Sequence, residues 1–109
     1  MELTETGLIE IELQGVEGEK IDIIDEDEQI ELVVKALSSK TIRNILRYIR
    51  DDPKDVSNIA KTLAMTEANI SAQIKKLEEA NLISCDYSSG LHGVRKISKL
   101  KVNRLTLSF

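Results

Sequence analysis

Short polar side chains near the middle of the chain could form hydrogen bonds with the edges of DNA bases. Ile70 and Ile74 lie one helical turn apart, as in a helix with one buried face. The remaining positions form a polar face, on which we expect DNA contacts from Thr66, Ala68, Asn69, Ser71, Ala72, Gln73 and Lys76. Asn and Gln can bond adenine bidentately, Ser can donate or accept, and Lys can reach guanine or phosphate. The two alanines would allow close approach to a major groove.

The same polar face would also fit the solvated side of any amphipathic helix. The preceding residues favour a helix-turn-helix over residues 55–82. Asp55 and Thr66 are suited to cap two successive helices. Ala64-Met65 forms the predicted turn, and Ala60 supplies the small residue where the second helix crosses the first closely.

Basic residues follow in a second element. Residues 82–87 and 94–102 predict two strands, and the Gly-rich turn between them contains His92. A basic hairpin beside a recognition helix can lie along the phosphate backbone or enter the minor groove. We therefore expect His92, Arg95 and Lys96 to contact DNA, although lysines on an edge strand also guard against aggregation.

The remaining elements flank this region. Residues 8–13 and 20–24 alternate apolar and polar on either side of a glycine-containing turn, which predicts a β-hairpin. Apolar stripes predict helices over 30–37 and 42–49, and the alternation of 105–109 predicts a last strand.

This order predicts an α+β fold, a winged helix-turn-helix with an N-terminal β-hairpin extension. We divide the chain into an acidic extension, residues 1–29, and a winged helix-turn-helix DNA-binding domain, residues 30–109.

Charge is strongly segregated along the chain. The net charge is −4, yet residues 1–31 carry twelve acidic side chains against one basic one. Residues 32–109 carry fourteen basic side chains against seven acidic ones. This segregation suggests two surfaces with different partners. A solvated acidic arm on an ordinary domain is the alternative.

Several site classes are excluded. Cys85 is the only cysteine and His92 the only histidine, so neither a disulfide framework nor a Cys/His zinc site can form within one chain. We expect no cofactor, and we expect Cys85 to be a small packed residue. The chain has no apolar run of membrane-spanning length and no signal-peptide pattern at its first residues, so we expect a cytoplasmic protein without membrane contact.

The central block resembles the helix-turn-helix of ArsR-type winged-helix regulators. Matching positions of that family's pattern are Ile59, Ala60, Leu63, Met65, Ile70, Ser71, Ile74, Leu77, Ala80, Leu82 and Ile83. Residues 36–46 resemble the family's preceding helix motif, and residues 90–96 are similar to the wing of archaeal members. The resemblance covers about residues 30–102. It implies a homodimeric transcriptional repressor, with the N-terminal helix and often the chain's end forming the dimer contact.

The chain departs from the family pattern at several places. The family's turn glycine is Ala64 here, its glycine before the wing is Asn81, and its recognition-helix histidine is replaced by the pair Ala72-Gln73. Metal-sensing members use a cysteine pair near the third helix. Since Cys85 stands alone, the resemblance does not extend to inducible metal sensing.

The sequence bears on three function classes. The first is a dimeric, sequence-specific regulator that binds double-stranded DNA, with Lys40, Arg43 and Arg47 as weaker phosphate contacts. The second is a protein-interaction module whose basic face docks an acidic partner, with the acidic N-terminal arm as a potential inhibitor. The third is an enzyme, which we do not expect. The sequence shows no carboxylate–histidine pairing, no nucleophile with a base and no phosphate-cradling Gly loop.

Overall fold

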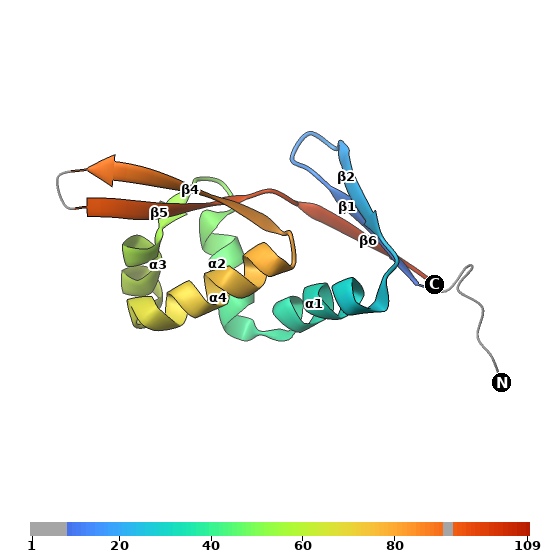
Figure 1. The fold of residues 1–109 in the computed structure, drawn as a ribbon, viewed down its shortest axis with the longest axis horizontal. Coiled ribbons are helices and arrows are strands. Elements are labelled where there is room, and N and C mark those ends of the chain that lie inside the picture. Colours follow the sequence, from blue (N-terminus) through green and yellow to red (C-terminus); the bar gives the residue numbers. More distant parts are fainter. Residues whose placement is uncertain (1–8, 91–92) are drawn as a thin grey trace.

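The computed structural model describes residues 9–90 and 93–109. Its elements, in chain order, are β1 (Glu10–Gln14), β2 (Lys20–Ile24), α1 (Asp27–Ser38), α2 (Lys40–Ile49), β3 (Lys54–Asp55), α3 (Val56–Leu63), α4 (Glu67–Glu79), β4 (Ile83–Gly90), β5 (Gly93–Leu100) and β6 (Arg104–Ser108). This confirms the predicted order of elements (Figure 1). The two-residue strand β3 is the one addition.

Three helices begin at a side-chain cap, and two of these caps, Asp55 and Thr66, are those that the sequence indicated. The Ser39 hydroxyl accepts a hydrogen bond from the Ile42 amide at 3.2 Å and starts α2. Asp55 caps α3, and the Thr66 hydroxyl accepts from the Asn69 amide at 3.1 Å to start α4. Each cap satisfies an amide that has no partner within the helix.

The strands form two antiparallel sheets. In the wing sheet the order is β3-β5-β4, and in the second sheet, which we call the terminal sheet, it is β2-β1-β6. Strand β6 pairs with β1 over five residue pairs, from Glu10 opposite Ser108 to Gln14 opposite Arg104. Residues on both sides of the predicted domain boundary therefore share one sheet.

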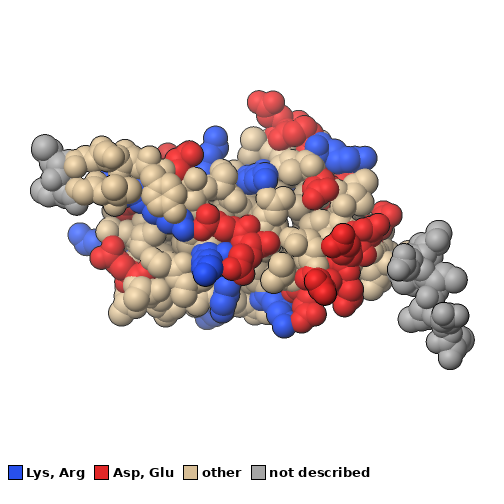
Figure 2. Space-filling model, in the orientation of Figure 1, with Lys and Arg blue, Asp and Glu red and all other residues tan. Residues whose placement is uncertain are grey.

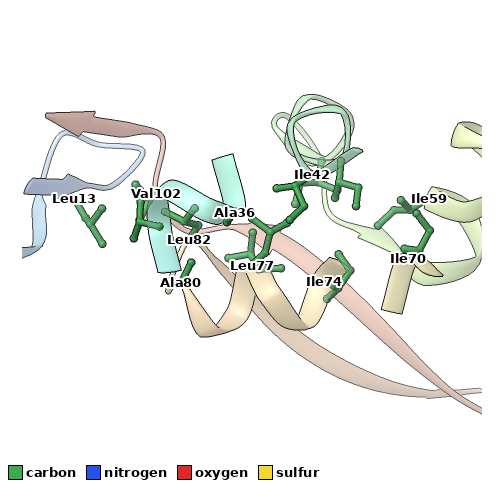
Figure 3. Packing of buried hydrophobic residues seen from close by; sticks show 14 of the residues in the cluster. Leu13, Ala36, Ile42, Ile59, Ile70, Ile74, Leu77, Ala80, Leu82 and Val102 are labelled. Atoms are coloured by element: carbon green, nitrogen blue, oxygen red, sulfur yellow. The ribbon is translucent and has the colours of Figure 1, made fainter. Parts of the chain in front are cut away.

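A single apolar cluster joins the terminal sheet to the helices. Ile11, Leu13 and Ile24 from the terminal sheet belong to the same buried cluster as Ile45 of α2 and Ile59 of α3. Figure 3 shows this packing running from Leu13 through the helices to Ile59. Because an isolated hairpin is marginal in water, this shared burial is what holds β1 and β2 in place.

The β1–β2 hairpin and the start of α1 lie at the C-terminal end of α4, where they share a hollow with Glu78 and Glu79. Figure 1 places the β1–β2 hairpin at the opposite end of the molecule from the tip of the wing. Acidic side chains gather at the end that carries β2 and the start of α1 (Figure 2). The described part of the arm therefore leaves the outer face of α4 uncovered. Over residues 9–90 and 93–109, no helix combines the length and the apolarity that a membrane span requires.

Truncating a buried side chain of β1 tests whether the terminal sheet is part of the core. Leu13 is fully buried, and we expect Leu13→Ala to lower the free energy of unfolding by about 2–5 kcal/mol. Ile23 on β2 is 45% exposed, so Ile23→Ala is the matched control with a much smaller loss. Urea unfolding measures both. Equal losses would show that the terminal sheet is not packed on the helices.

Candidate nucleic-acid interface

Helices α3 and α4 are joined by a tight turn that depends on a left-handed residue. Ala64 has φ of 55°, and the Met65 amide donates to the Ala60 carbonyl at 2.9 Å to close the end of α3. A left-handed conformation costs a residue other than glycine roughly 1–2 kcal/mol. Asn81, with φ of 62°, plays the same part at the end of α4. Both positions are those where the resemblance places glycine.

The orientation of α4 is fixed by its apolar side. Ile70, Ile74 and Leu77 are fully buried, and they pack in one cluster with Ile59 and Ala60 of α3. Their spacing of four and three residues places them on one face of the helix. The side chains between them must therefore face outward.

The outward face of α4 carries the residues that the sequence predicted. Ala68, Asn69, Ser71, Ala72 and Lys76 are exposed. Gln73 is half-buried, and Thr66 is exposed although its hydroxyl serves as the helix cap. Six of the seven predicted residues are thus exposed, and together with Gln73 they extend around the half of α4 opposite its buried side, which we call the α4 face.

Two hydrogen bonds organise the α4 face. The Gln73 amide nitrogen donates to the Asn69 side-chain oxygen at 3.1 Å, one helical turn away. At the start of the helix, the Ser57 hydroxyl donates to a Glu67 carboxylate oxygen at 2.7 Å and links α3 to α4. The first bond holds the two amide side chains together, so that they would present one joint pattern of donors and acceptors to a base pair.

The wing is a regular antiparallel hairpin beside these helices. Strands β4 and β5 pair from Ile83 opposite Leu100 to Gly90 opposite Gly93. Tyr87 and Val94 are 68% and 69% exposed, and the Lys96 ammonium lies 6.0 Å from the centre of the Tyr87 ring. These exposed apolar side chains were not among the predicted contacts. Each strand contains other apolar residues besides these two, so residue type alone does not indicate which of them are exposed.

Asp55 ties the wing to the start of α3. Its carboxylate accepts from the Asn58 amide at 2.7 Å as the helix cap and forms an ion pair with Arg95 of β5. The Arg95 Nε donates to the same carboxylate at 2.8 Å. The Asn58 amide, and after it the Arg95 guanidinium, hold the pKa of Asp55 below its ordinary value against the opposing effect of burial.

A second ion pair ties the wing to α4. The Lys96 ammonium donates to a Glu78 carboxylate oxygen at 2.5 Å, which raises the pKa of Lys96. Arg95 keeps 56% of its side chain exposed and Lys96 keeps 24%. Both predicted wing contacts are therefore engaged within the protein, and Arg95 is the more accessible of the two. His92 lies outside the described residues.

Two of the three weaker phosphate candidates on α2, Arg43 and Arg47, have structural partners too. The Arg43 guanidinium donates to the Leu37 carbonyl at 2.8 Å and satisfies the end of α1. Arg47 donates to the Asn44 side-chain oxygen at 2.9 Å, and Lys40 is exposed.

The described residues hold no group of three or more His, Cys, Asp or Glu side chains placed to bind a metal ion. Cys85 is partly buried with its sulfur 3.6 Å from the Ser98 hydroxyl, and burial raises the pKa of its thiol. A raised pKa keeps the thiol protonated and unreactive at neutral pH.

A comparison with family models matches residues 39–84 to the family described as bacterial regulatory protein, arsR family. The helix-turn-helix region is of the ArsR type. The match begins at the cap of α2 and ends in β4, so the ArsR-type segment contains α2, α3 and α4. The terminal sheet lies outside it. A comparison with curated protein sequences gives no match.

Solved structures confirm the winged helix-turn-helix fold around this ArsR-type segment. A fragment of a possible transcriptional regulatory protein from Mycobacterium bovis has a TM-score of 0.60 at 23% identity, over 67% of this chain and 74% of that chain. HlyU from Vibrio cholerae has a TM-score of 0.59 at 15% identity, over 68% and 76%. An ArsR family transcriptional regulator has a TM-score of 0.55 at 25% identity, over 70% and 77%.

The double role of Asp55 predicts a pH-dependent stability. Asp55→Ala removes the cap of α3 and the partner of Arg95, and we expect it to lower the free energy of unfolding by about 1–2 kcal/mol at neutral pH. A lowered folded-state pKa contributes stability that is complete above the unfolded value of about 3.9 and is lost as pH falls through the folded value. The gap between wild type and Asp55→Ala should therefore narrow in acid.

Urea unfolding at a series of pH values measures this gap. Asp55→Asn is the control, because asparagine also caps helices but carries no charge to pair with Arg95. It should lose less than the alanine variant at neutral pH. A gap between wild type and Asp55→Ala that stays constant from neutral to acid pH would contradict the assignment.

Proposed function

We propose that this protein is a sequence-specific transcriptional regulator that binds double-stranded DNA as a homodimer and acts as a repressor. The observation that carries the proposal is the α4 face, a surface of hydroxyl, amide and methyl side chains with one lysine, opposite a fully buried apolar side. We propose the cytoplasm as its location, as expected from the sequence.

The composition of the α4 face favours DNA bases over an acidic protein partner. From Thr66 to Gln73, Glu67 carries the one charged side chain, and the outward side chains are hydroxyls, amides and methyl groups. An acidic partner would be matched by cations, whereas base edges are read by such short polar groups. Arg95 of the wing and Lys76 near the end of the α4 face are both exposed and would supply charge for phosphates.

The comparisons support the same function. The matching family is one of regulatory proteins, and one similar structure is that of an ArsR family transcriptional regulator. The solution structure of the Mycobacterium bovis fragment is that of a homodimeric winged helix-turn-helix DNA-binding domain, with a TM-score of 0.59 at 23% identity over 67% of this chain and 64% of that chain.

A homodimer is proposed because one recognition helix buries too little surface for tight specific binding. The resemblance implies contacts by the N-terminal helix and the chain's end. Large apolar side chains are exposed on both: Leu32 and Val34 of α1 are 38% and 52% exposed, and Leu107 of β6 and the adjoining Phe109 are 44% and 88% exposed. A twofold dimer would read two half-sites about one helical turn apart and would cover the intervening DNA, which fits a repressor.

Replacing both amides of the α4 face tests the DNA-reading role. Each good bidentate contact contributes about 1–3 kcal/mol of discrimination. Asn69→Ala with Gln73→Ala should therefore weaken binding to a duplex selected from a random-sequence pool by at least about tenfold, and leave the unfolding curve close to that of wild type. Fluorescence anisotropy measures the affinity.

The matched control removes one Gln and one Asn elsewhere, through Gln29→Ala with Asn103→Ala, and should bind DNA like wild type. Raising the salt concentration should weaken wild-type binding steeply through counterion release. Unchanged binding by the Asn69/Gln73 variant would refute the recognition role of α4. A wild-type protein that binds no duplex at low salt would refute the proposed function as a whole.

The dimer surface is tested by placing charges on it. Val34→Glu and Leu107→Glu should each shift the protein toward monomer in sedimentation velocity, because a buried unpaired charge is costly. Val16→Glu is the control, since Val16 is 62% exposed in the turn between β1 and β2. If only the control disrupts the dimer, the contact is made by the β1–β2 turn and not by α1 and β6.

A further inference from the structure

A cavity of about 250 Å³ lies between α2 and β6, away from the α4 face. Its walls are apolar and come from parts of the chain that are distant in sequence: Leu37, Leu46, Leu82, Leu100, Val102 and Leu105. Four of these six side chains, Leu37, Leu46, Leu100 and Leu105, are only half-buried because they face this space.

Three arginines stand at the same cavity. Arg47 and Arg50 come from the end of α2, and Arg104 begins β6. All three are exposed residues. Arg50 lies 3.5 Å from an Asp51 carboxylate oxygen and Arg47 donates to the Asn44 side-chain oxygen, both in solvent-exposed contacts that a ligand carboxylate could replace. No carboxylate is among the residues that line the cavity.

Three arginines therefore gather at one cavity, although the chain as a whole has more acidic side chains, nineteen, than basic ones, fifteen. A second hollow, lined by residues of β2, the start of α1 and the end of α4, shows the opposite character, with Asp22, Asp25, Glu26, Glu78 and Glu79 in its walls. The two hollows therefore differ in the sign of charge that they would accept. Only the first combines charge with an apolar lining.

We propose that the α2–β6 cavity binds a small amphiphilic carboxylate, with its apolar part against the leucines and its carboxylate on the arginines. Guanidinium groups match carboxylates in a bidentate geometry. At about 30 Å³ per water-sized group, the cavity accommodates about eight such groups, the size of a medium-length alkyl chain or of one substituted aromatic ring. Free phosphate or a phosphate of DNA would leave the apolar walls unused.

This site goes beyond the proposed DNA binding and does not depend on it. Because its walls come from α2 on one side and β6 on the other, a ligand that fills it would stabilise this arrangement of the terminal sheet on the helices. The binding test therefore needs no DNA.

Decanoate is the probe, used below its micelle concentration with the full chain labelled at its leucine methyl groups. NMR titration should show saturable binding of one equivalent, with shifts concentrated at Leu46 and Leu105 and absent from Leu63 of α3, which does not line the cavity. Decanol tests the need for the charge, and decyltrimethylammonium tests its sign. Both should bind at least about tenfold more weakly, as expected from the loss of a hydrogen bond to a charged group.

Arg104→Gln should weaken decanoate binding by a similar factor, while Lys99→Gln, which removes an exposed cation of β5 outside the cavity, should leave it unchanged. The methyl spectrum of each variant shows directly that it is folded. Shifts centred on Leu32 and Leu107, equal binding of decanol or of the cationic amphiphile, or equal effects of the two variants would each overturn the proposal. Failure of DNA binding would leave it standing.

Discussion

The burial of one side of α4 is the constraint on which the proposed function depends. Ile70, Ile74 and Leu77 have no exposed surface, and burying a side chain of this kind contributes about 1.5–3 kcal/mol. Rotating α4 by half a turn about its axis would expose all three and bury side chains of the opposite face, which are now exposed. The cost of that rotation exceeds that of losing any surface ion pair, which is about 1 kcal/mol or less. The apolar stripe therefore determines which polar side chains are available to DNA.

Two ion pairs position the wing relative to the helices. Asp55 joins β5 to the start of α3, and Glu78 joins β5 to the end of α4. Since Arg95 and Lys96 are adjacent in β5, the two pairs hold neighbouring residues of one strand to two different helices. Each contributes little to stability, yet together they restrict the angle of the wing. The basic side chains predicted to bind DNA thus have a second role that the sequence did not reveal.

The features that could be predicted from the sequence depend on residues that lie close together along the chain. The caps at Asp55 and Thr66 and the apolar stripe of α4 involve residues within one or two helical turns, so a short segment contains the whole signal. The pairing of β1 with β6 joins residues about as far apart as the chain allows, and alternation in each strand does not identify its partner. The same holds for the α2–β6 cavity, whose walls come from several elements. It also holds for Arg95, whose charge was evident but whose partner Asp55 was not.

The positions of the acidic and basic side chains in the fold explain how a protein of negative net charge could bind DNA. An acidic protein is repelled by DNA as a whole, but the acidic side chains gather at the end that carries β2 and the start of α1 (Figure 2), while the wing projects at the other end (Figure 1). The electric field of the phosphates would orient a protein with this charge distribution, so that the acidic end points away from the duplex and the wing points toward it. Unpaired charges farther than about 10 Å from the phosphates are screened at moderate salt, so repulsion from the acidic end would weaken bound complexes little. The net charge of −4 is therefore compatible with DNA binding, because the position of the charges matters more than their sum.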